Sequence, residues 1–245
     1  MTDAADEIAF RSDVTVELVR SSAHDSDVLF AARVSTQGEQ TLEEASSGAE
    51  AGARDRGLIN YLMRDRHGSP FEHNSMTFYV QAPIFVFREF MRHRIASYNE
   101  ESGRYRELRP VFYVPGPERK LIQIGKTGHY EFIDGTPEQA ALVQAEAKAA
   151  ATQAYESYQR ILDSGVAREV ARIVLPLSIY SSMYVTMNSR SLMNFLSLRT
   201  KRDDTHFPSF PQREIEMVAE AMETLWAELM PMTYDAFNKN GRVAP

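Results

Sequence analysis

Apolar residues recur at every second position in three stretches of the chain. This alternation predicts strands over 14–19 (VTVELV), 76–82 (MTFYVQA) and 177–188 (LSIYSSMYVTMN). The residues that should share one face of the last two strands are Met76, Phe78 and Val80, and Leu177, Ile179, Met183, Val185 and Met187.

A spacing of three to four residues predicts helices elsewhere in the first half. It occurs over 27–34 (DVLFAARV) and over 58–66 (LINYLMRDR), and Gly68 should close the second of these helices. Pro83 suits the first turn of a helix over 83–94 (PIFVFREFMRHR), because a proline loses no intrahelical hydrogen bond there.

The second half carries stronger helix signals. TPEQ (136–139) is a capping box with proline at the first helical position, and it opens a helix that runs to DSG (163–165). The helical pattern continues over 166–175 (VAREVARIVL) and returns over 189–199 (SRSLMNFLSLR) and 209–229. In the last helix, a core-facing stripe is formed by Ile215, Val218, Ala219, Met222, Leu225, Trp226 and Leu229.

Two stretches lack such patterns. Residues 36–56 are small and polar, which predicts a loop or a frayed helix, and residues 110–135 hold four glycines and three prolines and should be mostly loop. Strands and helices mix without a regular βα alternation, so we expect an α+β fold with a mixed sheet flanked by helices. No linker is evident, and residues 1–245 should form a single domain.

Composition is that of an ordinary soluble globular protein, with 43% hydrophobic and 25% charged residues. No apolar run is long enough to span a bilayer, and the acidic start MTDAADEIAF lacks a signal pattern, so we expect a cytoplasmic protein. The net charge of -7 argues against nucleic acid and membrane surfaces as partners. The absence of cysteine excludes disulfides, a thiolate nucleophile and a cysteine-ligated metal.

Residues 92–109 (RHRIASYNEESGRYRELR) concentrate five arginines and a histidine in this acidic chain. Basic residues at a helix end can simply complement its carbonyl groups. On the predicted helix, however, Arg88 and Arg92 repel each other unless an anion lies between them. Arg92 and Arg94 would be roughly 200° apart on the helical wheel, so they should point toward a large ligand or across a subunit boundary.

The segment that follows could form a phosphate cradle. Ser102 and Gly103 precede Arg104, and Gly103 permits a positive φ, so backbone N–H groups, a hydroxyl and a guanidinium could surround an anion. A surface turn has the same composition. Glu100 and Glu101 are solvated residues by default, but beside arginines they could accept hydrogen bonds from ribose hydroxyls.

The stretch RHRIASYNEESGR (92–104) resembles the signature of the flavin-dependent thymidylate synthases: R-H-R, seven residues, then S-x-R. Four further blocks resemble that family in the same order, and the resemblance covers most of residues 14–235. They are AARVS (31–35), HGSPFEH (67–73), EVARIVLPL (169–177) and NSRSLMNFLSLR (188–199).

The resemblance implies an enzyme that methylates dUMP at C5 to give dTMP. Methylenetetrahydrofolate would donate the carbon, and NADPH would supply the reducing hydride through bound FAD. The resemblance also implies a homotetramer whose active sites are shared between subunits. Cysteine-dependent thymidylate synthases need a thiolate, so the missing cysteine agrees with flavin chemistry. No G-x-G-x-x-G motif occurs among the 12 glycines, so a Rossmann turn is not expected to hold the FAD.

The resemblance also implies site residues by position. The FAD-contacting set would be Ser69, Arg92, His93, Arg94, Glu100, Asn188, Ser189, Arg190 and Asn194. The dUMP-binding set would be Glu89, Arg92, Glu100, Glu101, Ser102, Gly103, Arg104, Arg172 and Arg199. Arg199 matches the arginine that polarises the uracil ring, and His67 matches a histidine near flavin and folate. Some members have an amide at the position of Glu89, and segments 115–135 and 200–211 are longer than expected and have no assigned role.

Other readings of the sequence are weaker. GKTG (125–128) lacks the glycine that a Walker A motif requires at position 120. The spacing of His67, His73 and His93 fits no metal-ligand pattern, and no metal is expected. Arg199 ends the apolar stripe of its predicted helix, where it could merely cap the helix or pair with a carboxylate. A non-catalytic nucleotide- or RNA-binding protein could use the same arginines.

Overall fold

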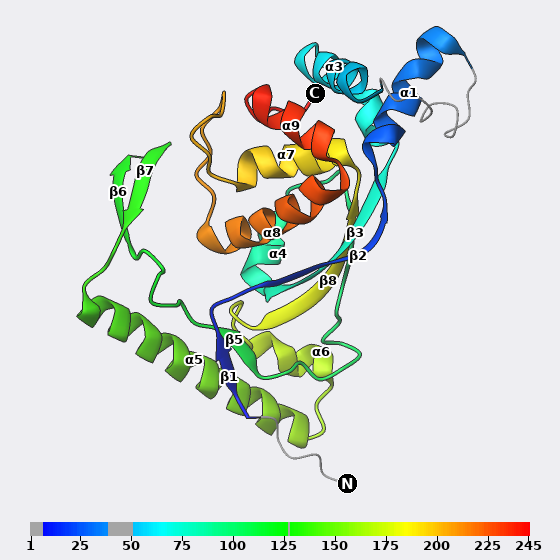
Figure 1. The fold of residues 1–245 in the computed structure, drawn as a ribbon. Helices are drawn as coiled ribbons and strands as arrows, with labels where there is room; N and C mark the ends of the chain where they lie inside the picture. The colour runs from blue at the N-terminus through cyan, green and yellow to red at the C-terminus, as the bar shows by residue number, and fades with distance from the viewer. Residues whose placement is uncertain (1–6, 39–50, 127) are drawn as a thin grey trace. The chain divides into compact units, whose positions relative to one another are not determined.

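The computed structural model describes residues 7–38, 51–126 and 128–245 (Figure 1). These residues group into two compact units. The first unit contains residues 7–15, Gln81–Arg92 and Asn99–Met183. The second contains the described residues of Val16–Val80, together with His93–Tyr98 and Tyr184–Pro245.

The three predicted strands are confirmed, and they belong to one four-stranded sheet with the order β2-β3-β8-β4. The strands are β2 (Thr15–Ser22), β3 (Ser75–Pro83), β8 (Tyr180–Met187) and β4 (Ser97–Glu100), of which β4 was not predicted. Met76, Phe78 and Val80 of β3 are fully buried, as the alternation requires. Leu177 is 48% exposed, because a turn that ends at Ile179 precedes β8, so its place in the strand pattern was wrong.

The first unit is built around the long helix α5 (Pro137–Asp163), which the sequence predicted at both ends. The capping box forms as expected between Thr136 and Gln139, and Gly165 ends the helix with a φ of 85°. The strands β1 (Ala9–Arg11) and β5 (Val111–Tyr113) pair in parallel. The core next to α5 consists of Leu108, Phe112, Ala151, Tyr155, Tyr158, Ala171 and Ile179.

Three predictions for the first unit were wrong. Residues 110–135 are not mostly loop: β6 (Ile122–Lys126) and β7 (His129–Ile133) form an antiparallel hairpin (green in Figure 1), in which Gly125 and Gly128 adopt positive φ. The helix after Pro83 is α4 (Ile84–Phe90). It ends before the R-H-R motif at 92–94, because its apolar stripe ends at Phe90. Segment 166–175 forms two short helices, α6 (Arg168–Ala171) and η2 (Arg172–Val174).

The helices of the second unit include α7, α8 and α9, which lie side by side (Figure 1). The described helices of the second unit are α1 (Asp25–Gln37), α3 (Ala51–Arg64), η1 (Ser69–Glu72), α7 (Ser189–Arg199), α8 (Arg213–Leu229) and α9 (Pro231–Lys239). The α7 prediction is confirmed to the residue. The α8 stripe is also confirmed, with Ile215, Val218 and Trp226 fully buried, although the helix begins at Arg213.

The start of α3 corrects the loop predicted over 36–56: residues 51–56 are helical, α1 reaches Gln37, and positions 39–50 lie outside the described residues. The end of α3 also differs from the prediction. Arg66, not Gly68, adopts the left-handed conformation after the helix (φ 66°), and the N–H of His67 bonds to the carbonyl of Leu62.

The α+β prediction is confirmed, with a parallel strand pair, an antiparallel pair and helices in both units. That residues 1–245 act as a single domain stays a prediction. In the described ranges, none of the helices combines the length and the apolar character that a membrane crossing requires.

Candidate functional site

The arginines of the R-H-R motif follow α4 rather than continue it. Met91 and Arg92 form a turn, and residues 93–94 are not helical, so the helical-wheel argument that made Arg92 and Arg94 point in opposite directions was wrong. Both side chains are exposed, and neither guanidinium has a hydrogen-bond or ion-pair partner among the described residues. Each is therefore available to an anionic ligand.

In the first unit, residues 102–106 form a tight turn. The carbonyl of Ser102 accepts the backbone N–H groups of Tyr105 (3.0 Å) and Arg106 (3.2 Å), and its hydroxyl accepts the N–H of Arg104 (3.3 Å). Gly103 does not adopt a positive φ, so that expectation was wrong. It is small for another reason: a Cβ there would lie 3.0 Å from Leu108 Cδ1 and 3.3 Å from Arg172 Cδ.

Carboxylates pair with two of the arginines around this turn. Glu101 contacts Arg106 Nε at 3.0 Å and accepts a hydrogen bond from Ser182 Oγ at 3.3 Å. Arg104 Nε contacts Glu169 at 2.7 Å. The exposed Arg172 makes no hydrogen bond or ion pair within the described part of the chain, which leaves its guanidinium open to a phosphate.

Glu100 has a raised pKa in the first unit. Burial raises the pKa of Glu100 and the charge of Glu101 adds to this, while a hydrogen bond with Ser181 and the charge of Arg172 oppose the change. A carboxyl with a raised pKa suits hydrogen bonding to a polar, uncharged group. Glu89 is half-buried on α4 of the same unit.

In the second unit, Arg199 and His93 form a direct hydrogen bond. Arg199 Nε donates to His93 Nε2 at 3.0 Å, and the His93 ring contacts Phe195 edge to face, with 4.9 Å between ring centroids. Burial and then the charge of Arg199 lower the pKa of His93 from 6.5 to about 4. His93 is therefore neutral at pH 7, and its proton lies on Nδ1.

Tyr98 fixes the backbone of His93, a contact that the sequence did not indicate. Its hydroxyl donates to the His93 carbonyl at 2.7 Å, and burial raises the pKa of Tyr98 to about 12. Tyr98 lies five positions after His93, among the seven residues between R-H-R and S-x-R, and the sequence suggested no role for it. The strand β4 that holds Tyr98 could have signalled its role, had its short alternation been recognised.

Four residues of the predicted FAD set lie at the N-cap of α7 or within it. Asn188 caps the helix by accepting the N–H of Ser191 at 2.9 Å, and the hydroxyl of Ser189 is buried and bonds to Asn74 at 2.8 Å. Asn194 is exposed, and its amide donates to the carbonyl of Arg190 at 3.2 Å.

Arg190 lies close to η1, where Gly68 makes room for it. A Cβ at Gly68 would lie 2.5 Å from Arg190 Cζ, so a larger residue there would force the guanidinium to shift from this position. Arg190 donates to Glu72 at 2.5 Å and to the Pro245 carbonyl at 2.6 Å. Its Nη2 has no partner among the described residues. Ser69 and His67 are exposed next to this glycine.

The predicted residues thus divide between the two units. The first unit holds Glu89, Arg92, Glu100, Glu101, Ser102, Gly103, Arg104 and Arg172. The second holds Ser69, His67, His93, Arg94, Asn188, Ser189, Arg190, Asn194 and Arg199. Each set combines guanidinium groups with carboxyl, hydroxyl or amide groups, which is a donor set suited to a phosphorylated ligand.

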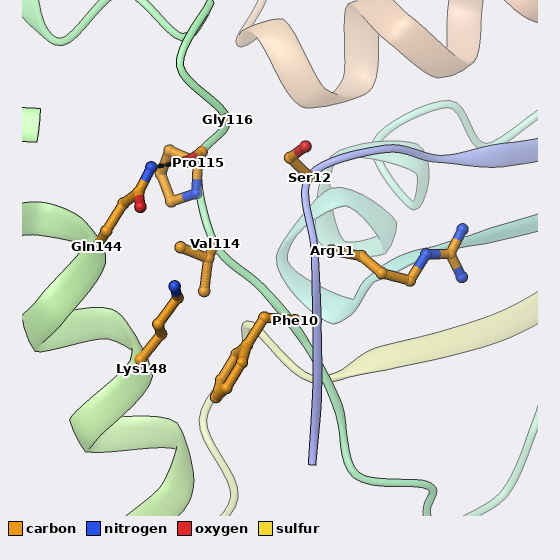
Figure 2. A pocket seen from close by; sticks show the side chains of 8 residues that line it. All are labelled: Phe10, Arg11, Ser12, Val114, Pro115, Gly116, Gln144 and Lys148. Carbon is orange, nitrogen blue, oxygen red and sulfur yellow. Dashed lines mark hydrogen bonds between the residues drawn. The ribbon is translucent and has the colours of Figure 1, made fainter. Parts of the chain in front are cut away.

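A pocket of about 180 Å³ lies elsewhere in the first unit (Figure 2). Its apolar side is Phe10, Val114 and Pro115, and Ser12, Gln144 and Lys148 form its polar side. None of the predicted site residues lines it. Among the described residues, no group of three or more His, Cys, Asp or Glu side chains is arranged to hold a metal ion.

An α+β fold with open arginines, paired carboxylates and a neutral histidine beside an arginine defines a candidate enzyme for a phosphorylated substrate. The family model described as "Thymidylate synthase complementing protein" matches residues 17–232. The chain belongs to this family, the flavin-dependent thymidylate synthases, and is an enzyme. This sets aside the alternative of a non-catalytic nucleotide- or RNA-binding protein.

Relatives span the whole chain. The flavin-dependent thymidylate synthase of Streptomyces avermitilis is 66% identical over 249 residues, covering 100% of both chains. That of Tropheryma whipplei strain TW08/27 is 60% identical and covers 96% of this chain and 97% of its own length. Among solved structures, the UMP/dUMP methylase PolB from Streptomyces cacaoi bound with 5-Br dUMP is 58% identical, with a TM-score of 0.90 over 97% of this chain and 100% of that chain.

Proposed function

We propose that this enzyme methylates dUMP at C5 to give dTMP, with methylenetetrahydrofolate as the carbon donor, NADPH as the reductant and FAD as the bound cofactor. The observation that carries the proposal is full-length similarity to flavin-dependent thymidylate synthases together with similarity to a methylase bound with 5-Br dUMP. The absence of cysteine agrees with it, because no thiolate is available to add to the uracil.

The residues of the second unit fit a flavin dinucleotide. Arg94 and Nη2 of Arg190 are open cations for its phosphates, and the exposed Ser69 and Asn194 offer a hydroxyl and an amide. We assign Asn188 and Ser189 to the support of this end of α7, and His93 to the same cofactor. The family resemblance adds Arg92 and Glu100, which belong to the first unit. When bound, FAD supplies the reducing equivalents that convert the transferred methylene group to a methyl group.

The residues of the first unit fit the nucleotide substrate. Arg172 and Arg92, whose guanidinium groups are open, would bind the phosphate together with Ser102, Gly103 and Arg104. The carboxyls Glu100 and Glu101 would accept hydrogen bonds from the sugar, and Glu89 would contact the substrate through an uncharged group, because a carboxylate repels phosphate.

Arg199 is the proposed catalytic residue. The uracil gains negative charge on its oxygen and nitrogen edge as C5 becomes a nucleophile, and a fixed guanidinium stabilises this charge more than it stabilises the neutral ground state. The hydrogen bond from Nε to His93 fixes the plane of the guanidinium. Because His93 is neutral, it does so without adding a second positive charge that would repel Arg199.

We further propose that residues 1–245 act as one domain in a cytoplasmic homotetramer with shared active sites, and that neither nucleic acid nor membrane is a partner. The family resemblance supports the tetramer. The argument that Arg92 and Arg94 point in opposite directions from a helix no longer supports it, because α4 ends at Phe90. Light scattering of the active enzyme tests it, and a fully active monomer would contradict it.

The experiment for the main reaction is an anaerobic assay of FAD-reconstituted protein. We expect dTMP only when dUMP, methylenetetrahydrofolate and NADPH are all present, together with an oxidised-flavin absorbance spectrum. Omission of each component in turn is the control. Failure of the reconstituted protein to form dTMP in the complete mixture would overturn the proposal.

A second candidate substrate is UMP. It is favoured by the similarity to the Streptomyces cacaoi protein, which is described as a UMP/dUMP methylase. Side-by-side kcat/KM values for UMP and dUMP decide the question: comparable values support a dual-specificity enzyme, and turnover of dUMP alone excludes it.

A further inference from the structure

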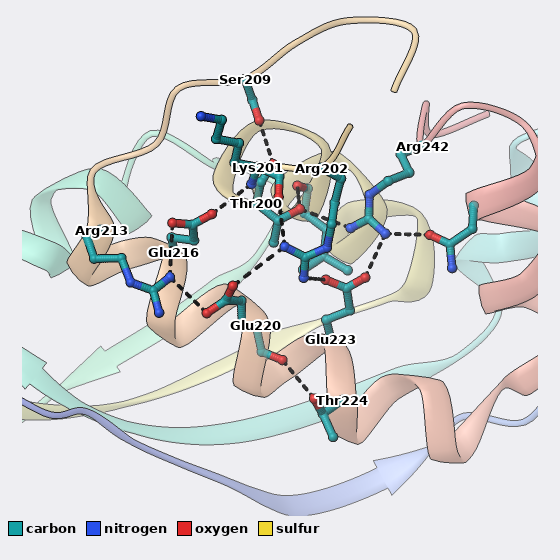
Figure 3. Close-up of polar contacts among 12 residues, drawn as sticks. Thr200, Lys201, Arg202, Ser209, Arg213, Glu216, Glu220, Glu223, Thr224 and Arg242 are labelled. Carbon is teal, nitrogen blue, oxygen red and sulfur yellow. Dashed lines mark hydrogen bonds and ion pairs between the residues drawn. The ribbon is translucent and has the colours of Figure 1, made fainter. Parts of the chain in front are cut away.

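A buried ion pair lies in the second unit, among residues that the proposed site does not use (Figure 3). Arg242 Nη1 contacts Glu223 Oε1 at 2.7 Å, and both side chains are only 5% exposed. The other oxygen of Glu223 accepts a hydrogen bond from Arg202 Nη2 at 3.0 Å. Asn238 also accepts a hydrogen bond from Arg242.

This ion pair is a costly way to stabilise a fold. Two charges lose their hydration when buried, and apolar residues of similar size often stabilise a protein as well or better. Arg242 also adopts a left-handed backbone conformation (φ 57°), and its buried Nε has no partner among the described residues. Such an arrangement suggests that geometry rather than stability is what the pair provides.

The geometry that it fixes is that of Thr200, the residue after Arg199. Arg242 Nη2 donates to Thr200 Oγ1 at 3.0 Å, and this hydroxyl donates to the Leu196 carbonyl at 2.7 Å. The Thr200 carbonyl accepts from Ser209 Oγ at 2.5 Å, and its N–H bonds to Leu196 at 3.0 Å. Thr200 is 1% exposed, and every polar group that it has is engaged.

The segment after Thr200 is tied to α8 and to the turn after α9. The N–H of Lys201 bonds to Glu216 at 2.9 Å, and Arg202 reaches Glu220 at 3.6 Å (Figure 3). His206 packs against Gly241, where a Cβ would lie 2.4 Å from its ring. Segment 200–211 therefore anchors the C-terminal end of α7 to α8 and to the turn after α9.

We propose that Thr200 and the pair Glu223–Arg242 are positioning residues for Arg199. They fix the last turn of α7, so that Arg199 Nε meets His93 and the guanidinium is held ready for the substrate. This inference rests on the proposed function of Arg199. The ion pair itself makes no hydrogen bond or ion pair with Arg199 or His93. It reaches the end of α7 through Thr200 and through Arg202, which Glu223 also binds.

The experiment compares two substitutions at Thr200. Thr200→Val keeps the shape but loses the hydroxyl that Arg242 and Leu196 share, whereas Thr200→Ser keeps the hydroxyl and loses only a methyl group. We expect Thr200→Val to lower kcat about tenfold with the KM for dUMP within about twofold, since small displacements of a catalytic group cost rate rather than binding. Thr200→Ser should behave like wild type, and flavin content should be unchanged in both.

A second readout does not depend on turnover. The nitrogen NMR signals of Arg199 Nε and His93 Nε2 report their hydrogen bond, and they should shift in Thr200→Val and in Glu223→Gln but not in Thr200→Ser. If wild type makes no dTMP, the proposed function fails, while these signals still test the positioning. Unchanged signals in both Thr200→Val and Glu223→Gln, or an unchanged kcat in an active Thr200→Val enzyme, would overturn it.

Discussion

The neutral state of His93 leads to a quantitative prediction about pH. Burial and the charge of Arg199 lower the pKa of His93 from 6.5 to about 4 in the folded protein, whereas the unfolded chain should titrate near the ordinary value. Between these two values the unfolded state binds a proton that the native state does not bind. The contribution of His93 to stability is therefore complete above a pH of about 6.5 and is lost as the pH falls toward about 4.

The size of the effect follows from the shift. Each unit of pKa corresponds to about 1.4 kcal/mol, so the full shift of His93 would give roughly 3.4 kcal/mol. The ring is partly exposed to water, which screens the charge, and we expect about 1–2 kcal/mol. Replacing His93 with glutamine keeps a hydrogen-bond acceptor for Arg199 but removes the titrating group.

The assay has two parts. Carbon-13 labelling of histidine allows the His93 resonance to be followed by NMR from about pH 7 to about pH 4. The resonance should shift only as the pH approaches about 4, because that is the pKa of His93 in the folded protein. The free energies of unfolding of wild type and His93→Gln, at matched protein concentration, should diverge over the same interval, with the wild type losing more stability. A His93 resonance that titrates near its ordinary pKa, or parallel stability curves, would refute the reasoning.

Three further outcomes are expected. Arg199→Lys should lower turnover roughly 10²–10³-fold with fold and flavin content kept, because the planar fork is lost; wild-type turnover would reduce Arg199 to a helix cap. Gly68→Ala should weaken flavin binding in a fluorescence titration, since its Cβ would lie 2.5 Å from Arg190 Cζ. Gly57→Ala on α3 is its matched control and should bind flavin normally while gaining up to about 1 kcal/mol of stability. Intact mass after incubation with 5-fluoro-dUMP and methylenetetrahydrofolate should show an unmodified chain, and an adduct on Ser102 that survives denaturation would contradict this.

Much of the fold could be predicted where local signals agree with tertiary packing. The capping box at Thr136 set the start of α5, and Gly165 set its end, because both act through contacts close in the sequence. Helix α7 was predicted to the residue because its apolar stripe coincides with an asparagine cap at Asn188.

The failures have equally local causes. The β6–β7 hairpin was missed because β6 is almost wholly exposed, and the alternation in β7 consists of only two half-buried residues, Tyr130 and Phe132, which is too short a pattern to identify a strand. The predicted helix over 83–94 was too long, because a helical pattern does not show where burial stops supporting it, which happens at Phe90. Gly103 was predicted to permit a positive φ, whereas the close approach of Leu108 and Arg172 explains why a glycine stands there.

The site could be predicted as a set of residues but not as an arrangement. The hydrogen bond between His93 and Arg199 joins residues 106 positions apart, and no periodicity reports such a contact. Thr200 and Arg242, 42 positions apart, gave no signal either, since a buried threonine and a buried arginine look like surface residues in the sequence.

The central claim is that this chain's flavin supplies the reducing equivalents for methylation of dUMP. The most direct test is an anaerobic single-turnover experiment. The bound flavin is first reduced with NADPH, and the free NADPH is then removed. Addition of dUMP and methylenetetrahydrofolate together should restore the oxidised-flavin spectrum and yield one dTMP per flavin, and neither compound alone should do so. Formation of dTMP without flavin oxidation, or flavin oxidation without dTMP, would contradict the account.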